Sequence, residues 1–172
     1  MMILSDRDIA NLLNEGILKI IPVSENDIQP CSVDLHLGKE LLTLHGKKID
    51  ISKQSYKLKP NEFLLASTEE YVEIPRHICG QVDGRSSVAR LGVSIHQTGG
   101  YIDAGYNGNI TLELYNCSDR PFEISWGDSI CQIIFHVLSS ECLREYGSTE
   151  LKSKYQFSEG VVKSKYGEQT DG

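Results

Sequence analysis

The chain has 172 residues and a formal net charge of −7, its pI is near 5.2, and 40% of its residues are hydrophobic. This size and apolar content suit a single domain over residues 1–172 with a substantial core. The acidic balance argues against a broad nucleic-acid surface, because binding to a phosphate backbone relies on clustered Lys and Arg. No apolar run approaches the ~18 residues of a membrane span, and the first residues lack the order of a secretory signal. We therefore expect a cytoplasmic protein that binds no membrane.

The first segment predicts a helix over residues 5–16. Ser5 is a good N-cap, Asp6 and Asp8 suit the first turn of a helix, and an apolar stripe follows until Gly16. Short apolar runs bounded by turn residues then predict strands over residues 17–23, 32–37, 40–44, 63–67, 71–74, 78–82, 110–115, 121–126 and 130–138. Strands at this spacing favour an all-β barrel or sandwich over βαβ units. Residues 47–59 are polar and basic and are expected to form a solvated excursion.

Residues 84–116 combine a strand pattern with groups that a structural strand does not need. Aliphatic side chains alternate with Thr111, Glu113 and Tyr115, so Glu113 should face away from the aliphatic layer. A single Glu in such a strand is ordinarily a solvated surface charge. The same stretch, however, carries two arginines, two serines and a second acid: Arg85, Ser86, Ser87, Arg90 and Asp103. Such a set can hold an anion and still move a proton.

These residues carry a family resemblance. The segments Gly84-Arg85-Ser86-Ser87, Ile102-Asp103-Ala104-Gly105-Tyr106-Asn107-Gly108 and Thr111-Leu112-Glu113-Leu114 resemble the core of the dCTP deaminases, relatives of the trimeric dUTPases. Similar segments occur in the family's order at residues 4–5, 29–35, 146–148 and 154–156, so the resemblance spans nearly the whole chain. It implies a dUTPase-like distorted β-barrel with an N-terminal helix, a homotrimer with sites shared between subunits, and a flexible C-terminal lid over residues 147–172.

The resemblance implies roles for four catalytic residues. Deamination at C4 requires a nucleophilic water, a base and an acid, and one carboxyl can serve as both base and acid. Glu113 is the candidate for that carboxyl, Ser86 would orient the water, and Arg90 would hold the carboxylate and the base. Asp103 would direct a water at the α-phosphate. The implied substrate-binding set is Arg85, Ser86, Ser87, Val88, Ala89, Arg90, Asp103, Thr111, Leu112, Glu113, Gln132, Tyr146, Lys154 and Ser158.

Two of these assignments have alternatives. Gln132 lies in an apolar run, where a core amide bonded to its neighbours explains it as well as nucleotide contact does. The polar tail is typical of a mobile terminus, although Tyr146 and Lys154 suit a lid that closes over a nucleotide. The family carries a glutamine where this chain has Ser158. The chain thus departs from the family pattern at the residue that would make the contact that closes the lid.

Composition also bears on cofactors. The five cysteines are spaced singly, so we expect reduced thiols. The H-x-E and P-C-x-x-C patterns of zinc-dependent cytosine deaminases do not occur, so deamination here is expected to need no zinc. The resemblance implies Mg²⁺ bound through the nucleotide triphosphate, with dCTP and dUTP as ligands and dTTP as a candidate inhibitor.

Gly100 and Tyr101 predict a second reaction. The dUMP-forming members of the family have a glycine followed by an aromatic residue here, and a glycine would leave room for a water and permit a positive φ. The alternative is that Gly99 and Gly100 only make a tight turn. The sequence thus predicts conversion of dCTP to dUMP and diphosphate, which supplies dUMP for thymidylate synthesis. A deaminase that releases dUTP, a plain dUTPase and a non-catalytic nucleotide sensor are the alternatives.

Overall fold

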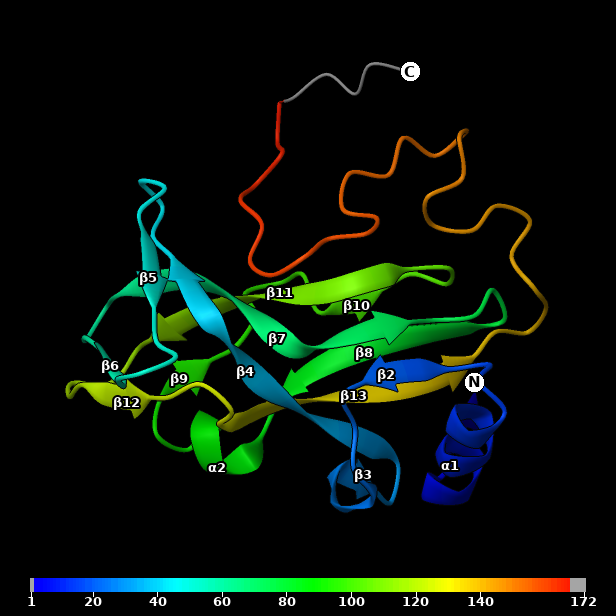
Figure 1. Ribbon diagram of the computed structural model, residues 1–172, viewed down its shortest axis with the longest axis horizontal. Helices are drawn as coiled ribbons and strands as arrows, with labels where there is room; N and C mark the ends of the chain where they lie inside the picture. The colour runs from blue at the N-terminus through cyan, green and yellow to red at the C-terminus, as the bar shows by residue number, and fades with distance from the viewer. Residues whose placement is uncertain (1, 168–172) are drawn as a thin grey trace.

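A curled antiparallel sheet dominates the computed structural model, which describes residues 2–167 (Figure 1). The strands are β1 (Met2–Ile3), β2 (Lys19–Ile21), β3 (Ile28–Gln29), β4 (Ser32–Leu42), β5 (Lys48–Asp50), β6 (Tyr56–Leu58), β7 (Phe63–Glu73), β8 (Ile78–Gly84), β9 (Val93–Ser94), β10 (Tyr101–Ile102), β11 (Asn107–Asn116), β12 (Phe122–Ile124) and β13 (Ser129–Val137). The helices are α1 (Asp6–Asn14), the 3-10 helix η1 (Glu25–Asp27) and α2 (Ser86–Ala89). The predicted all-β class is confirmed.

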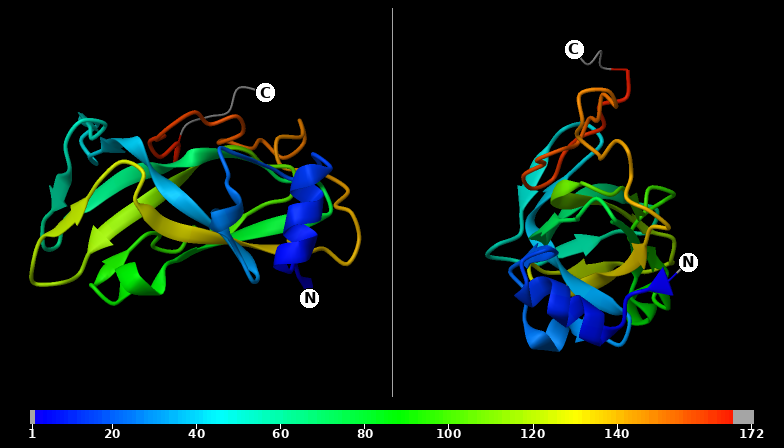
Figure 2. Two further views of the ribbon diagram at one scale, coloured as in Figure 1. Left: turned by 60° about the horizontal axis from the view of Figure 1, so that its bottom comes forward. Right: turned by 90° about the vertical axis from the view of Figure 1, so that its right-hand side faces the viewer.

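The main sheet runs in the order β10-β8-β13-β4-β7-β11-β9, and β6 pairs with β12 in a separate two-stranded sheet. The sheet curls around one aliphatic core, as the two turned views show (Figure 2). Leu37, Leu114 and Phe135 are fully buried there. Burial of each such side chain contributes about 1.5–3 kcal/mol, so the alternating strands supply the main stabilising term. Within residues 2–167, no helix is long and apolar enough to cross a membrane.

Helix α1 begins as the sequence predicts. The Ser5 hydroxyl accepts a hydrogen bond from the Asp8 N–H at 3.3 Å, and the Asp8 carboxylate accepts one from the Ser5 hydroxyl at 2.9 Å. The first bond satisfies a helix-end N–H that otherwise has no partner, and the second fixes the capping side chain. Ile9 is fully buried, so the helix packs its apolar stripe on the core. The helix ends at Asn14, two residues before the predicted end, and Gly16 follows with φ +68°.

Two long strands, β4 and β7, replace two pairs of predicted short strands. The gaps between the predicted strands, at residues 38–39 and 68–70, lie where β4 and β7 pack closely. A Cβ on Gly38 would lie 2.8 Å from the Ser67 hydroxyl, so only glycine fits that approach. The Glu70 carboxylate is buried, and it accepts hydrogen bonds from the His36 N–H at 3.0 and 3.1 Å. Gly38 and Glu70 therefore continue the strands rather than end them.

Residues 47–59 are also more ordered than expected. This stretch contains β5 and β6, and it buries Ile51 and Leu58 in the core. Most of the stretch is exposed, as expected of a solvated excursion, but the two short strands were not predicted. Two apolar residues separated by polar ones are too few to indicate a strand pattern.

Candidate active site

Glu113 lies in the middle of β11, on the face away from the core. Ile110, Leu112 and Leu114 are at most 4% exposed, whereas Thr111 and Glu113 are half-buried on the other face. The expected alternation is therefore present. It also means that the Leu112 side chain belongs to the core, so only its backbone can contact a ligand.

Backbone groups of the loop after β9 hold Glu113 in place. The Gln97 N–H donates to the Glu113 carboxylate at 2.8 Å, and the Glu113 N–H donates to the Ile95 carbonyl at 2.8 Å. Gly99 lies against the same carboxylate, where an added Cβ would be 3.2 Å from Oε1. Among the ion pairs of residues 2–167, none involves Glu113. Hydrogen bonds rather than a charged neighbour thus orient this acid within one chain.

A cavity of about 310 Å³ opens in front of Glu113. Its walls come from β7, β10, β11, the loops beside β10, residue Tyr146 and the C-terminal arm, which we define as residues 147–167. The lining residues are Leu65, Gly99, Tyr101, Ile102, Asp103, Tyr106, Ile110, Thr111, Glu113, Tyr146, Tyr155, Ser158, Val162, Lys163 and Ser164. The volume falls at the lower end of small-molecule sites, and two carboxylates share its wall. Of the predicted site residues, the structure thus brings together Tyr101, Asp103, Thr111, Glu113, Tyr146 and Ser158.

Aromatic rings form one side of this cavity. The Tyr106 and Tyr146 rings lie 5.6 Å apart at a tilt of 59°, and Tyr106 donates a hydrogen bond to the Asn109 carbonyl at 2.7 Å. Burial raises the pKa of Tyr106, so its hydroxyl stays protonated at neutral pH. The Tyr101 hydroxyl donates to the Cys79 Sγ at 2.9 Å, and this bond together with burial raises the pKa of Tyr101 to about 12. Neutral phenols therefore face the ligand space.

The C-terminal arm closes the cavity by pairing with β11. The Phe157 N–H donates to the Asn107 carbonyl at 2.7 Å, and the Asn109 N–H donates to the Ser158 carbonyl at 2.8 Å. Figures 1 and 2 show this segment, coloured orange to red, lying across β11. The Ser158 hydroxyl donates to the Tyr155 carbonyl at 2.7 Å. The serine that replaces the family's glutamine therefore makes its hydrogen bond within the arm. The arm is thus folded over the cavity, as a lid would be.

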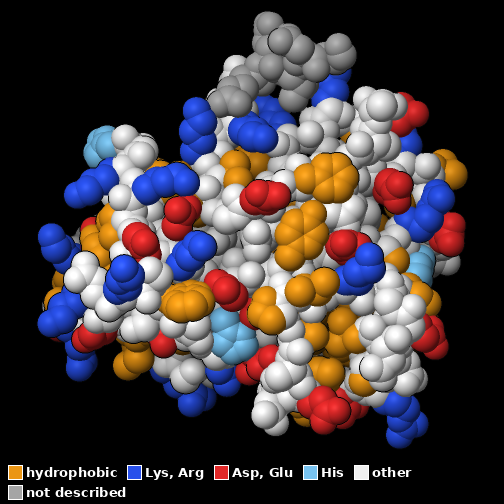
Figure 3. Space-filling view, viewed as in Figure 1, with side chains coloured by type: hydrophobic (Ala, Val, Ile, Leu, Met, Phe, Trp, Pro, Cys, Tyr) orange, Lys and Arg blue, Asp and Glu red, His pale blue; other side chains and the backbone are white. Residues whose placement is uncertain are grey.

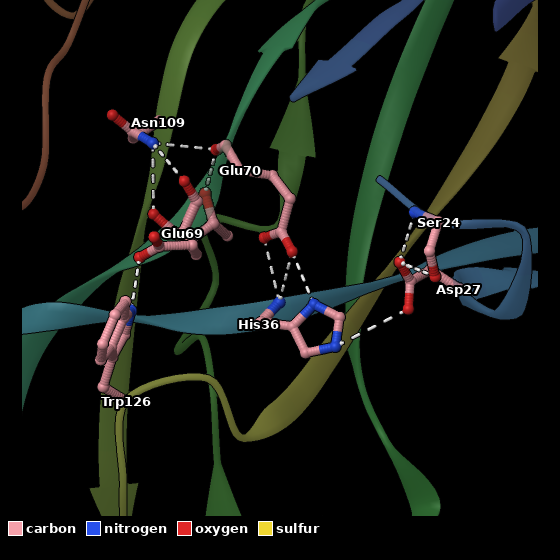
Figure 4. A network of polar contacts seen from close by, with 8 residues as sticks. Ser24, Asp27, His36, Glu69, Glu70, Asn109 and Trp126 are labelled. Atoms are coloured by element: carbon pink, nitrogen blue, oxygen red, sulfur yellow. Dashed lines mark hydrogen bonds and ion pairs between the residues drawn. The ribbon is translucent and has the colours of Figure 1, made fainter. Parts of the chain in front are cut away.

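Asn109 joins the arm to the sheet (Figure 4). Its side-chain oxygen accepts a hydrogen bond from the Gly160 N–H at 3.0 Å, and its side-chain nitrogen donates to the carbonyls of Thr68, Glu69 and Glu70 at 2.9–3.3 Å. The Glu70 carboxylate is in turn 2.6 Å from the ring nitrogen Nδ1 of the His36 side chain. Burial raises the pKa of Glu70, and its bonds to His36 oppose that shift. One amide thus links a buried polar network to the lid.

Helix α2 and its arginines lie outside this cavity. Ser86, Ser87, Ala89 and Arg90 are exposed and Val88 is buried, and none of the residues 85–90 lines the cavity of its own chain. Arg85 instead forms an ion pair with Asp34 at 3.3 Å. One chain therefore does not bring the predicted Ser86 and Arg90 to Glu113.

Gln132 is also separate from the cavity. It accepts a hydrogen bond from the Ser32 hydroxyl at 2.9 Å and lies opposite Asp34 on β4 and Asp83 on β8. The amide oxygen of Gln132 is thus bonded to a neighbouring side chain, and the half-buried amide can also contact a ligand. Gln132 and Arg85 both lie beside Asp34, so the two form one polar cluster on the β4–β13–β8 face. Burial raises the pKa of Asp34, and Arg85 opposes that shift.

Gly100 packs against β8 and leaves no room for a water, contrary to the prediction. Gly100 is buried, and neither Gly99 nor Gly100 is among the residues with positive φ. A Cβ on Gly100 would lie 2.7 Å from the Val82 carbonyl oxygen and 3.0 Å from the His96 ring, so no space for a water is left on that side. The Val82 N–H donates to the Gly100 carbonyl at 2.7 Å. Glycine is required here for close packing against β8, which places the adjacent Tyr101 at the cavity.

Several lining residues have no counterpart in the predicted set. Tyr155, Lys163 and Ser164 reach the cavity only because the arm folds back on itself. The basic run at residues 163–165 was the available sequence signal, but a polar tail does not by itself predict where it docks. Lys154, which was predicted, does not line the cavity, and its ammonium group donates to the Lys165 carbonyl at 2.7 Å. Within residues 2–167, no three His, Cys, Asp or Glu side chains are grouped as in a metal site.

The sequence is similar to those of known proteins. A family model described as dCTP deaminase-like matches residues 3–138. The chain is 38% identical to a protein of Methanosphaera stadtmanae named dCTP deaminase, dUMP-forming, over 99% of this chain and 97% of that protein.

Two solved structures show similar folds. One is the 2'-deoxycytidine 5'-triphosphate deaminase of Agrobacterium tumefaciens, with a TM-score of 0.68 and 22% identity over 78% of this chain. The chain spans about half, 48%, of that protein's chain. The other is the dUTPase of Staphylococcus bacteriophage 80alpha, with a TM-score of 0.50 and 20% identity over 76% of this chain and 96% of that chain. At these identities the likeness concerns the fold, which is the dUTPase-like fold that the sequence resemblance implies.

Proposed function

This chain belongs to the dCTP deaminase-like family, and we propose that it deaminates dCTP and hydrolyses the resulting dUTP in place to dUMP and diphosphate. The observation that carries the proposal is the shared wall of the cavity, where Glu113 and Asp103 face one space beside Tyr106. The near full-length relative named as dUMP-forming supports the same pair of reactions. The dUMP formed would supply thymidylate synthesis.

In the deamination, Glu113 would carry the proton. A water oxygen bonds to C4 of cytosine as Glu113 takes the proton of that water, and the same carboxyl then protonates the amine. The C4–N bond breaks, so dCTP and water give dUTP and ammonia. Thr111, beside Glu113 on the exposed face of β11, would contact the base.

In the hydrolysis, Asp103 would direct a second water at the α-phosphorus. The bond from that phosphorus to the bridging oxygen breaks, and diphosphate leaves. The buried ring of Tyr106 would lie beneath the deoxyribose and leave no room for a 2'-hydroxyl. Ser158 from the arm, with Tyr146 just before the arm, would close the other side.

A second copy of the chain would complete the site. Arg85, Ser86 and Arg90 lie on or beside α2, outside the cavity of their own chain. We therefore assign them, with Ser87, Val88, Ala89 and Gln132, to the cavity of a neighbouring copy in a homotrimer. There Ser86 would orient the attacking water, Arg90 would hold Glu113 and the base, and Arg85 would bind phosphate oxygens.

Mg²⁺ would bind through the triphosphate. Such ions keep several waters and take one or two carboxylates in addition to phosphate oxygens, so they need no cage of protein ligands. The exposed Asp103 carboxylate on the cavity wall fits that role. When bound, the ion would offset the charge of the phosphates. Zinc has no part in the proposed chemistry, and dTTP is a candidate competitor for the same cavity.

Incubation with dCTP and Mg²⁺ tests the proposal. Ammonia is assayed while dUTP, dUMP and diphosphate are separated by ion exchange, before and after treatment with a zinc-selective chelator. We expect equal amounts of ammonia, dUMP and diphosphate, little free dUTP, and no effect of the chelator. Accumulation of dUTP would identify a simple deaminase, and turnover of dUTP without ammonia from dCTP would identify a dUTPase. Binding without turnover of either nucleotide would identify a sensor.

A further inference from the structure

A chain of three hydrogen-bonded groups ties β10 to the main sheet. The Tyr101 hydroxyl donates to the Cys79 Sγ at 2.9 Å, and the Cys79 thiol donates to the His136 carbonyl at 3.7 Å. Tyr101 lies opposite Gln81 of β8, so Cys79 is its diagonal neighbour on the same face of the sheet, within reach of an aromatic side chain. Cys79 is 3% exposed. The phenol is therefore anchored to a buried group of the sheet.

This anchor lies directly before the acid of the proposed hydrolysis. β10 consists of Tyr101 and Ile102 alone, and Asp103 follows it. All three residues line the cavity. An element with few backbone contacts opens locally more easily than the long strands of a sheet. The bond from phenol to thiol is thus a second tie, beside the backbone pairing with β8, for the segment that carries Asp103.

Glu113 is held by other groups. Its carboxylate accepts a hydrogen bond from the Gln97 N–H at 2.8 Å. Between that loop and β10, the Gly100 carbonyl accepts a hydrogen bond from the Val82 N–H of β8 at 2.7 Å. The loop that orients the acid is therefore tied to β8 by its own backbone. Loss of the Cys79 thiol should act on β10 and leave the acid of the deamination in place.

We propose that Cys79 is a positioning residue for the hydrolysis of dUTP. Through the Tyr101 phenol it holds β10, so that Asp103 stays directed at the α-phosphorus. Cys79 is not among the residues that line the cavity, so it acts through the phenol and not on the substrate. The inference rests on the proposed function for the second reaction, whereas the bond from phenol to thiol rests on the geometry alone.

The products of dCTP turnover test this role. For Cys79→Ala we expect the ratio of dUMP to dUTP to fall at least about fivefold, with ammonia release and affinity for the imido analogue of dUTP, whose α–β bridge resists hydrolysis, within about twofold of the parent protein. Cys79→Ser should restore most of the ratio, because its hydroxyl can accept from the phenol and donate to the His136 carbonyl. Cys142→Ala removes a half-buried thiol outside the cavity and is the control. An unchanged ratio in Cys79→Ala, or an equal loss of ammonia and dUMP, would overturn the assignment.

Tyr101→Phe separates the bond from the packing of the thiol, since it removes the donor and keeps Cys79. We expect the same fall in the ratio as in Cys79→Ala, and no further fall in the double variant, because each change breaks the same bond. Falls that multiply in the double variant would show that the two side chains act independently.

Titration of the Tyr101 phenol tests the bond without turnover. The bond to Cys79 and burial raise the pKa of Tyr101 to about 12. Acidic side chains are common on the surface (Figure 3), and the charge of one of them, Asp103, adds to this effect. A phenol that donates a hydrogen bond is favoured in its neutral form, so Cys79→Ala should lower the pKa of Tyr101 and Cys79→Ser should return it towards the parent value. NMR of tyrosine labelled at the ring carbon that bears the hydroxyl measures the titration.

The two measurements distinguish the inference from the proposed function. A pKa of Tyr101 that is the same in Cys79→Ala and the parent protein would overturn the bond itself. A parent protein that forms no dUMP from dCTP would overturn the proposed function and the role of Cys79 in hydrolysis together. Formation of dUMP by the parent protein with an unchanged ratio in Cys79→Ala would overturn the role of Cys79 alone.

Discussion

The Gln97 N–H and the Glu113 carboxylate are 2.8 Å apart, and this bond fixes the acid from the backbone of a neighbouring loop. The Glu113 N–H is also held, by the Ile95 carbonyl at 2.8 Å. A glutamine at position 113 would keep the orientation of this side chain, since its amide oxygen can still accept the hydrogen bond from the Gln97 N–H. Proton transfer and binding can therefore be separated at this position.

Glu113→Gln should abolish proton transfer while the nucleotide still binds. We expect ammonia release from dCTP to fall by about 100-fold or more, with affinity for the imido analogue of dUTP within about threefold of the parent protein. Stopped assays of ammonia and calorimetry measure the two effects. Glu15→Gln, on the exposed end of α1, is the control with the same chemical change. Deamination near the parent rate would remove Glu113 from the mechanism.

Local patterns predicted the parts of the fold that depend on neighbours in sequence. Period-2 alternation placed Glu113 on the face away from the core, and capping chemistry placed the start of α1 at Ser5. Both patterns express rules of a single strand or helix, so they hold whatever the rest of the chain does.

Features that depend on distant segments were predicted less well. The continuation of β4 through Gly38 and of β7 through Glu70 was not predicted, because their partners, Ser67 and His36, lie on distant segments of the chain. The position of Lys163 depends on a loop closed by Lys154, and nothing in a polar tail predicts that closure. Short-range patterns carry no information on such contacts, which only the folded sheet creates.

Asp103→Asn should separate the two proposed reactions. If Asp103 directs the water at the α-phosphorus, diphosphate release from dUTP should fall by at least about 100-fold, while ammonia release from dCTP falls much less and dUTP accumulates. Ion-exchange separation of the products measures both. An equal loss of the two activities would indicate that Asp103 serves nucleotide binding as a whole.

Gly100→Ala should destabilise the protein. The new Cβ would lie 2.7 Å from the Val82 carbonyl oxygen, which belongs to the backbone of β8 and cannot easily move. We expect a loss of about 1–3 kcal/mol in the free energy of unfolding, as is usual for overpacking. Gly84→Ala, whose Cβ would meet its nearest neighbour at 3.4 Å, is the control for stability. A Gly100→Ala variant as stable as the parent in urea titrations would contradict the packing role.

Gly100→His should shift the product of the reaction from dUMP towards dUTP, and this prediction is separate from the loss of stability. Because the residue packs on β8 and precedes Tyr101 and Asp103, a bulky side chain should displace β10 rather than occupy a water site. We expect diphosphate release to fall further than ammonia release, in a protein that is also less stable. Full diphosphate release by the Gly100→His variant would show that this position does not affect the second reaction.

Asn109→Asp should release the lid from the sheet. The Asn109 side-chain nitrogen donates to the carbonyls of Thr68, Glu69 and Glu70, and a carboxylate there would face those oxygens with no proton to donate. Loss of such bonds in a partly buried site costs about 1–3 kcal/mol, and the carboxylate would turn away and give up its bond to the Gly160 N–H. The arm should then leave β11 in a larger fraction of molecules.

Two measurements check this release. Amide exchange at Phe157 and Asn109, whose N–H groups pair the arm with β11, should become at least about tenfold faster, and the KM for dCTP should rise while the exchange of the core strands stays unchanged. Asn107→Asp is the matched control, because the hydrogen bonds of Asn107 within residues 2–167 come from its backbone and survive the substitution. If Asn109→Asp and Asn107→Asp behave alike, the Asn109 side chain does not hold the lid, and backbone pairing alone keeps the arm over Glu113.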